Sequence, residues 1–216
     1  MLDKILDIIY PPVCGVCGRI DKNSLCKKCE IQLRKQAVFG TDDYKEDYNK
    51  YFDEHLYAFM YSGVVRSIIL NYKFNDDSYL YKTFTNFLLK NKNIVENIKS
   101  YDIIVPVPLS KKREKERGYN QSLLIAKEIS SSINIDIDKT CLKKTKNIVA
   151  QSTLNKEKRL KNTIGVYTIK YSKNIQNKKV LIVDDIYTTG STVNECSKIL
   201  KQAGAKNIGI LTIAKD

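Results

Sequence analysis

The segment from Val180 to Thr192 constrains the fold of this 216-residue chain more than any other. It begins with a continuous apolar run, Val180 to Val183, of the kind found in parallel strands that are buried on both faces. Two adjacent carboxylates, Asp184 and Asp185, follow this run, and a short loop of Thr, Gly and Ser then leads into a helix-like stretch. In open α/β sheets, ligands bind where strands end in this way. The segment therefore predicts a buried strand that delivers polar side chains to a binding site.

The rest of the chain favours a doubly wound parallel sheet, because short apolar runs alternate with amphipathic stretches from residue 101 onward. We expect strands at 102–108, 166–169, 179–183 and 208–214. We expect helices at 191–202 and at 120–133, the latter with Leu123, Leu124, Ala126 and Ile129 on its buried side. Nearer the N-terminus, the spacing predicts helices at 2–9, 64–72 and 79–89 and a strand from residue 56. We interpret residues 40–54 as a polar linker or surface loop.

The loop from Thr188 to Thr192 has the composition of a phosphate-binding loop. Backbone N–H groups and hydroxyls at the start of a helix attract anions, and the helix dipole adds to this attraction. The carboxylates of Asp184 and Asp185 can accept hydrogen bonds from sugar hydroxyls or hold magnesium-bound waters. A ligand with a phosphate at one end and a diol about one ribose away would satisfy both features. The alternative is an ordinary strand-to-helix turn with a capping serine, which needs no paired carboxylates.

Four cysteines near the N-terminus form two Cys-x-x-Cys pairs, Cys14 with Cys17 and Cys26 with Cys29. Two such turns that face each other give the tetrahedral sulfur site that zinc prefers. A disulfide or an iron–sulfur cluster is the alternative, but a chain without an export signal keeps its thiols reduced. Four protein ligands leave no open position for a reactive water, so we expect a structural zinc. We interpret Cys141 and Cys196 as buried thiols and the single histidine, His55, as a partly buried structural residue.

The net charge of +13 is concentrated in one part of the chain. Residues 105–165 contain 14 cationic and 6 anionic side chains, a net charge of +8. Such a region favours an anionic partner, either a nucleic acid or a polyphosphate metabolite. A general lysine bias is the alternative, since 31 of the 37 cations are lysine.

Several motifs together resemble one family. The segment with Asp184 and Asp185 resembles the 5-phosphoribosyl 1-pyrophosphate (PRPP) motif of type I phosphoribosyltransferases. Other stretches resemble the ComF family of competence proteins, of the ComFC type. These are the entry from Pro11 to Cys17, Tyr61 to Arg66 with Lys73-Phe74, Pro106 to Leu109, Arg117 to Gln121, Gln151 with Leu154, Arg159 with Asn162, and Gly165 to Tyr167. The resemblance covers essentially the whole chain.

The resemblance implies an α/β fold with a type I phosphoribosyltransferase-like parallel sheet, flanked by helices, and a small N-terminal zinc ribbon. We expect three parts: a zinc-binding four-cysteine module with a leading helix at 1–36, a hood or linker region at 37–100, and the core with the PRPP motif at 101–216. Asp184 and Asp185 would bind the ribose hydroxyls of PRPP. Thr188, Thr189, Gly190, Ser191 and Thr192 would bind its 5′-phosphate. The loop with Lys111, Lys112 and Arg113 would lie near the pyrophosphate and its magnesium, and residues 143–163 would close over the site.

The resemblance leaves the activity open. In purine-salvage relatives an acidic residue near the start of the phosphate loop acts as the base, and Thr188 occupies that place here. One hypothesis is pentosyl transfer from PRPP in support of DNA uptake, with single-stranded DNA and other competence proteins as partners. The alternatives are a non-catalytic PRPP-sensing regulator and a phosphoribosyltransferase of nucleotide metabolism unrelated to competence. Charged residues interrupt the first ten positions and no apolar run could span a membrane, so we expect a cytoplasmic protein. The sequence predicts neither the acceptor nor the oligomeric state.

Overall fold

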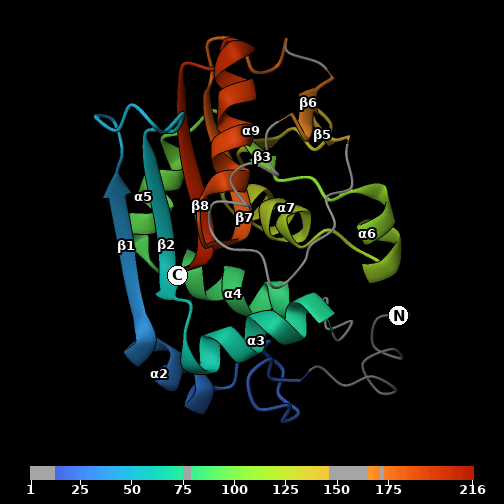
Figure 1. Ribbon diagram of the computed structural model, residues 1–216. Coiled ribbons are helices and arrows are strands. Elements are labelled where there is room, and N and C mark those ends of the chain that lie inside the picture. The colour runs from blue at the N-terminus through green and yellow to red at the C-terminus, as the bar shows by residue number, and fades with distance from the viewer. Residues whose placement is uncertain (1–12, 75–78, 146–164, 171–172) are drawn as a thin grey trace.

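The computed structural model describes residues 13–74, 79–145, 165–170 and 173–216, which form a mixed α/β fold around a six-stranded sheet (Figure 1). The strand order is β1-β2-β8-β7-β3-β4. All neighbouring strands run parallel except β1, which pairs antiparallel with β2 at one edge. The strands are β1 (Ala37–Asp43), β2 (Glu54–Met60), β3 (Ile103–Pro106), β4 (Asp136–Ile137), β7 (Lys179–Tyr187) and β8 (Asn207–Lys215). The expected parallel sheet is confirmed.

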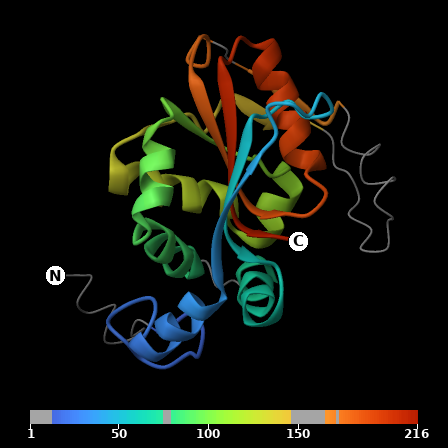
Figure 2. The ribbon, with the colours of Figure 1, turned by 90° about the vertical axis from the view of Figure 1, so that its left-hand side faces the viewer.

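Helices cover both faces of the sheet. On one face, α3 (Gly63–Phe74), α4 (Leu80–Leu89), α5 (Lys92–Lys99) and α7 (Gln121–Ile133) share a core with Leu181 and Val183 of β7. On the other face, α9 (Ser191–Gln202) and the two-stranded ribbon of β5 (Leu142–Lys144) and β6 (Tyr167–Ile169) pack on Val180 and Ile182. Figure 2 shows the sheet between α4 and α5 on one side and α9 on the other. Successive residues of β7 therefore feed two separate cores, which explains its unbroken apolar run.

Capping residues set where several helices begin. Helix α7 begins after Asn120, whose side chain accepts a hydrogen bond from the backbone N–H of Leu123 at 3.3 Å. Helix α5 begins after Asn91 in the same way, with the N–H of Ile94 at 3.0 Å. None of the helices in the described part of the chain is both long and apolar enough to cross a membrane.

Three details differ from the sequence-based expectations. Strand β7 continues past Val183 to Tyr187, because β8 keeps pairing with it as far as Lys215. The acidic pair therefore lies within the strand and not after it. Residues 37–43 form the edge strand β1, so only 44–53 of the expected linker is a loop. On α7, Leu123 and Leu124 are half-buried, and the fully buried apolar residues are Ile125, Ala126 and Ile129. The predicted helix at 2–9 lies outside the described residues.

The cysteine region is part of the main core. Cys14, Cys26 and Cys29 are buried in the same cluster as Leu80 and Phe84 of α4. Helix α2 (Lys27–Gln36) follows the second cysteine pair and leads directly into β1. The Thr83 hydroxyl of α4 donates a hydrogen bond to the Ser24 carbonyl at 2.8 Å. A β-carbon on Gly15 would lie 2.4 Å from both Leu80 and Thr83, so the close approach of this region to α4 requires glycine.

Candidate functional site

The acidic pair sits at the carboxyl end of β7, and helices α3 and α7 hold its two side chains. Lys73 at the end of α3 forms an ion pair with Asp185, with 3.0 Å between Nζ and Oδ1. The Ser122 hydroxyl in the first turn of α7 donates a hydrogen bond to Asp184 Oδ1 at 2.8 Å. The backbone N–H of Asp185 donates to the same oxygen at 2.9 Å. The two carboxylates therefore belong to one preformed arrangement built by three elements.

The two carboxylates also perturb each other. Burial raises the pKa of Asp184 to about 7, and the negative charge of Asp185 adds to this rise, while Lys73 and Ser122 oppose it. Near neutral pH the free protein therefore holds Asp184 partly protonated. A ligand that donates hydroxyl hydrogen bonds to Asp184, or a cation beside it, would favour its ionised form.

The loop after β7 forms the expected turn into a helix. Gly190 has a φ of +70° and is the residue before α9. The backbone N–H of Ser191 donates to Thr189 Oγ1 at 3.3 Å, and the hydroxyls of these two residues are also hydrogen-bonded. A pocket is lined by Asp184 together with all the residues from Thr188 to Thr192. The structure thus joins one of the predicted carboxylates and the entire predicted phosphate loop in one small concave site.

The three cations expected near the pyrophosphate do not form a loop. Lys111, Lys112 and Arg113 begin helix α6 (Lys111–Arg117), which has no buried residue. Ser110 caps this helix by accepting from the N–H of Arg113 at 3.3 Å, and its charged side chains are strong helix formers. Lys111 and Lys112 are exposed, and Lys112 lies 3.9 Å from Glu116 on its own helix. The expectation of a flexible basic loop at this position is therefore wrong.

Other cations face the acidic pair more directly. Besides Lys73, Arg117 at the end of α6 is attracted by Asp185, although burial lowers the pKa of its guanidinium. Lys144 of β5 is attracted by Asp184, while burial and the neighbouring Arg113 lower the pKa of its amine. Lys73 and Arg117 belong to the family-like motifs but carried no predicted role. Lys144 had no local signal, because only the folding of the β5–β6 ribbon brings it to the site.

The ends of the segment expected to close over the site lie beside α9. Strands β5 and β6 pair antiparallel, with Lys144 opposite Tyr167. The N–H of Gly165 donates to Glu195 of α9 at 2.9 Å. Residues 146–164 between these strands lie outside the described residues, and so do most of the residues predicted to form the closing loop.

The four N-terminal cysteines form a compact cluster. Their sulfur atoms all lie within 4.8 Å of one another, and the Cys17 and Cys26 sulfurs are 3.9 Å apart. A tetrahedral zinc site with bonds of about 2.3 Å places its sulfurs about 3.8 Å apart, so the spacing fits this metal. All four are free thiols in this structure. The sulfur arrangement could therefore hold a metal ion such as zinc.

The thiols of this cluster already perturb one another. For Cys14, burial raises the pKa, but backbone hydrogen bonds from Cys26, Cys17 and Val16 outweigh it and lower the pKa to about 7. Burial and the other three thiols raise the pKa of Cys29. A divalent cation would remove the mutual repulsion of the thiolates, which is how structural zinc contributes to folding.

Comparison with known proteins gives results for both halves of the molecule. A family model described as the phosphoribosyl transferase domain matches residues 120–216. Competence protein F of Haemophilus influenzae is 27% identical over 211 residues, covering 91% of this chain and 92% of that protein. Competence protein ComFC of Streptococcus pneumoniae is 28% identical over 213 residues, covering 99% of this chain and 85% of that protein. The DNA utilization protein YhgH of Escherichia coli O157:H7 is 30% identical over 114 residues, covering 53% of this chain and 49% of that protein. The family resemblance and the fold class expected from the sequence are both confirmed.

Proposed function

Because this chain is a homologue of competence protein F and ComFC and carries a phosphoribosyl transferase domain, we propose that it binds PRPP with magnesium at the end of β7 and acts in the handling of incoming single-stranded DNA. The observation that carries the proposal is the pocket shared by Asp184 and the loop from Thr188 to Thr192. One ribose 5-phosphate spans such a pocket, with its diol at the carboxylates and its phosphate at the loop.

Each part of the site has a role in this proposal. Asp184 and Asp185 accept hydrogen bonds from the ribose hydroxyls, and the amides and hydroxyls of residues 188–192 bind the 5′-phosphate. Lys73 gives up part of its contact with Asp185 when the diol enters. Magnesium, when bound with PRPP, neutralises the pyrophosphate, and the nearby cations Arg117, Arg113 and Lys144 stabilise the same charge. The chemistry would be displacement of pyrophosphate from the ribose, in which the protein mainly positions groups and stabilises charge.

The place of Thr188 bears on whether PRPP is turned over. This residue is exposed at the start of the loop and cannot act as a carboxylate base. A PRPP sensor without turnover is therefore the second candidate function. Release of pyrophosphate, measured with single-stranded DNA and a panel of metabolites as acceptors, distinguishes transfer from sensing.

The names of the relatives support a role in DNA handling. They are described as competence proteins and DNA utilization proteins. The exposed helix α6, with five cationic and two anionic residues among seven, offers a surface for phosphates near the site. We propose that this work takes place in the cytoplasm, where zinc held by Cys14, Cys17, Cys26 and Cys29 stabilises the N-terminal region.

Calorimetry of PRPP with magnesium tests the site directly. Asp185→Asn removes a charge and leaves the shape of the side chain nearly unchanged, so the fold should persist. We expect affinity to fall about ten- to a hundredfold, the value of one lost charge-assisted hydrogen bond. Asp136→Asn, an exposed substitution of the same kind on β4, is the matched control and should bind as the wild type does. No binding by the wild type, or equal binding by Asp185→Asn, would contradict the proposal.

A further inference from the structure

We propose that Tyr187, held in place by His55, is a positioning residue that supports the phosphate loop from below. The inference rests on the proposed function, because the loop is the expected site of the 5′-phosphate. It also assigns a role to the histidine and to the β1–β2 hairpin, which the binding site itself does not use.

Tyr187 is the last residue of β7 and lies directly against Gly190 of the loop. A β-carbon on Gly190 would lie 2.3 Å from the Tyr187 hydroxyl oxygen, so the phenol end packs against the bare backbone of this residue. The carbonyl of Gly190 accepts from the N–H of Asn194 at 2.9 Å, which fixes the first turn of α9. The position of the Tyr187 ring therefore sets the height and direction of the backbone that would face a phosphate.

His55 of β2 holds the other side of the ring. The two ring centroids are 4.4 Å apart with an interplanar angle of 26°, a stacked arrangement. Phe52 adds an edge contact to Tyr187, with centroids 6.3 Å apart. His55 has no exposed surface, although the sequence predicted only partial burial. Its side chain cannot contact a ligand, so any effect on binding must pass through Tyr187.

The protonation of His55 follows from its hydrogen bonds. The Thr212 hydroxyl donates its only proton to the Ala214 carbonyl at 3.1 Å. Its oxygen must therefore accept the contact at 2.8 Å from His55 Nε2, which fixes the proton on that nitrogen. Burial lowers the pKa of His55 to about 3, and the nearby Asp42 only partly offsets this. The ring that stacks on Tyr187 is thus neutral and has one fixed orientation.

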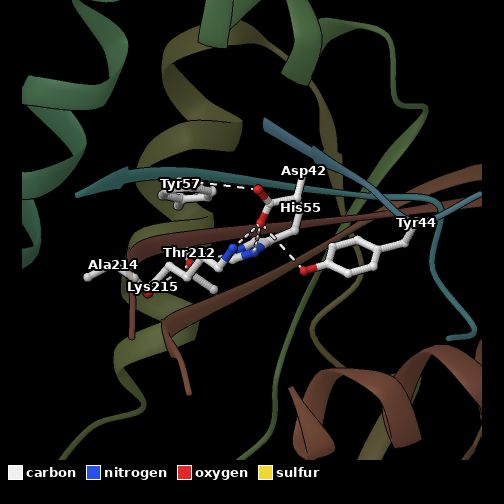
Figure 3. Close-up of polar contacts among 7 residues, drawn as sticks. All are labelled: Asp42, Tyr44, His55, Tyr57, Thr212, Ala214 and Lys215. Atoms are coloured by element: carbon white, nitrogen blue, oxygen red, sulfur yellow. Dashed lines mark hydrogen bonds and ion pairs between the residues drawn. The ribbon is translucent and has the colours of Figure 1, made fainter. Parts of the chain in front are cut away.

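A polar cluster on the hairpin fixes this arrangement from outside (Figure 3). The Asp42 carboxylate of β1 is paired with Lys215, accepts from the Tyr44 and Tyr57 hydroxyls at 3.4 Å each, and faces His55 Nδ1 at 3.8 Å. The Tyr44 side chain also hydrogen-bonds to Tyr187. The edge strand is therefore connected to the phosphate loop through two aromatic side chains.

The alternative is that Tyr187 and His55 only fill the core. In that case their loss would lower the melting temperature but leave the affinity for PRPP unchanged once the protein is folded. Phe59→Leu provides the matched control, because Phe59 lies on the same strand as His55, is equally buried and packs on Phe87, away from the loop.

The experiment measures two quantities in Tyr187→Leu, His55→Gln and Phe59→Leu. The first is the affinity for PRPP with magnesium by calorimetry. The second is hydrogen exchange of the Asn194 amide in the free protein, which reports the loop without any ligand. For Tyr187→Leu we expect affinity to fall about tenfold or more and exchange to rise by a similar factor relative to Phe59→Leu. His55→Gln, which can still donate to Thr212, should change both quantities in the same direction.

The outcomes are distinguishable. Affinity and exchange equal to those of Phe59→Leu at a matched melting temperature would overturn the positioning role. If the wild type does not bind PRPP, the proposed function fails, and exchange of the Asn194 amide alone decides the inference. If Tyr187→Leu does not fold, His55→Gln decides it by the same two measurements.

Discussion

Replacing Asp184 with asparagine should stabilise the free protein at neutral pH while it weakens ligand binding. The carboxylate lies next to Asp185 in a largely buried position, and its pKa is raised to about 7. In the unfolded chain the same group titrates near its ordinary value of 3.8. The amide of asparagine can still accept hydrogen bonds from Ser122 and from the N–H of residue 185, so the substitution removes mainly the cost of the charge.

The size and sign of the effect follow from the two pKa values. Below pH 3.8 both states are protonated and the group costs nothing. As the pH rises towards 7, the unfolded chain loses its proton while the folded protein keeps it. The free energy of unfolding then falls by about 1.4 kcal/mol per pH unit and levels off above pH 7. Between pH 5 and pH 8 the stability advantage of Asp184→Asn over the wild type should therefore grow by about 3 kcal/mol.

Urea unfolding of both proteins at several pH values between 5 and 8 measures this advantage. Asp136→Asn, on the exposed surface of β4, controls for the general effect of removing one negative charge. A constant difference between Asp184→Asn and the wild type across the range would refute the reasoning, because it would mean that Asp184 titrates alike in the folded and unfolded states. A widening gap would identify the acidic pair as a place where stability is sacrificed for binding.

Three further results are expected. Protein purified without added metal should contain about one zinc per chain by elemental analysis, and Cys26→Ser should speed hydrogen exchange in both α2 and α4, because the cysteines share a core with α4; metal-free protein with oxidised cysteines would contradict this. Charge reversal at the exposed Lys111 and Lys112 should weaken single-stranded DNA binding for all sequences alike, and affinity should fall steeply with salt; salt-insensitive binding would limit these cations to other roles. Because burial lowers the pKa of His55 to about 3, the unfolding free energy should fall as the pH drops below 6.5, by about 1.4 kcal/mol per unit, and His55→Gln should lose this slope; an unchanged slope would show that the histidine is not buried in its neutral form.

The sequence alone determined the parts of the protein that depend on neighbouring residues. An apolar run, two carboxylates and a Thr-Gly-Ser loop within 13 consecutive residues predict a strand, a turn and a helix start, because strand burial and helix capping depend on local order. The spacing of the two cysteine pairs predicted a four-thiol cluster for the same reason, and the structure brings the sulfurs together. Both sites could be located before any contact between distant segments was known.

The tertiary structure decided which distant residues surround these sites. Lys73 and Ser122 reach the acidic pair only because α3 and α7 pack on the same face of the sheet. The edge strand β1 has a polar, acidic sequence that reads as a loop, and it becomes a strand because β2 offers an unpaired edge. His55 meets Tyr187 across two strands that are 132 positions apart in the chain. Such pairings depend on which surfaces remain to be buried after the local elements form, and no pattern of adjacent residues contains that information.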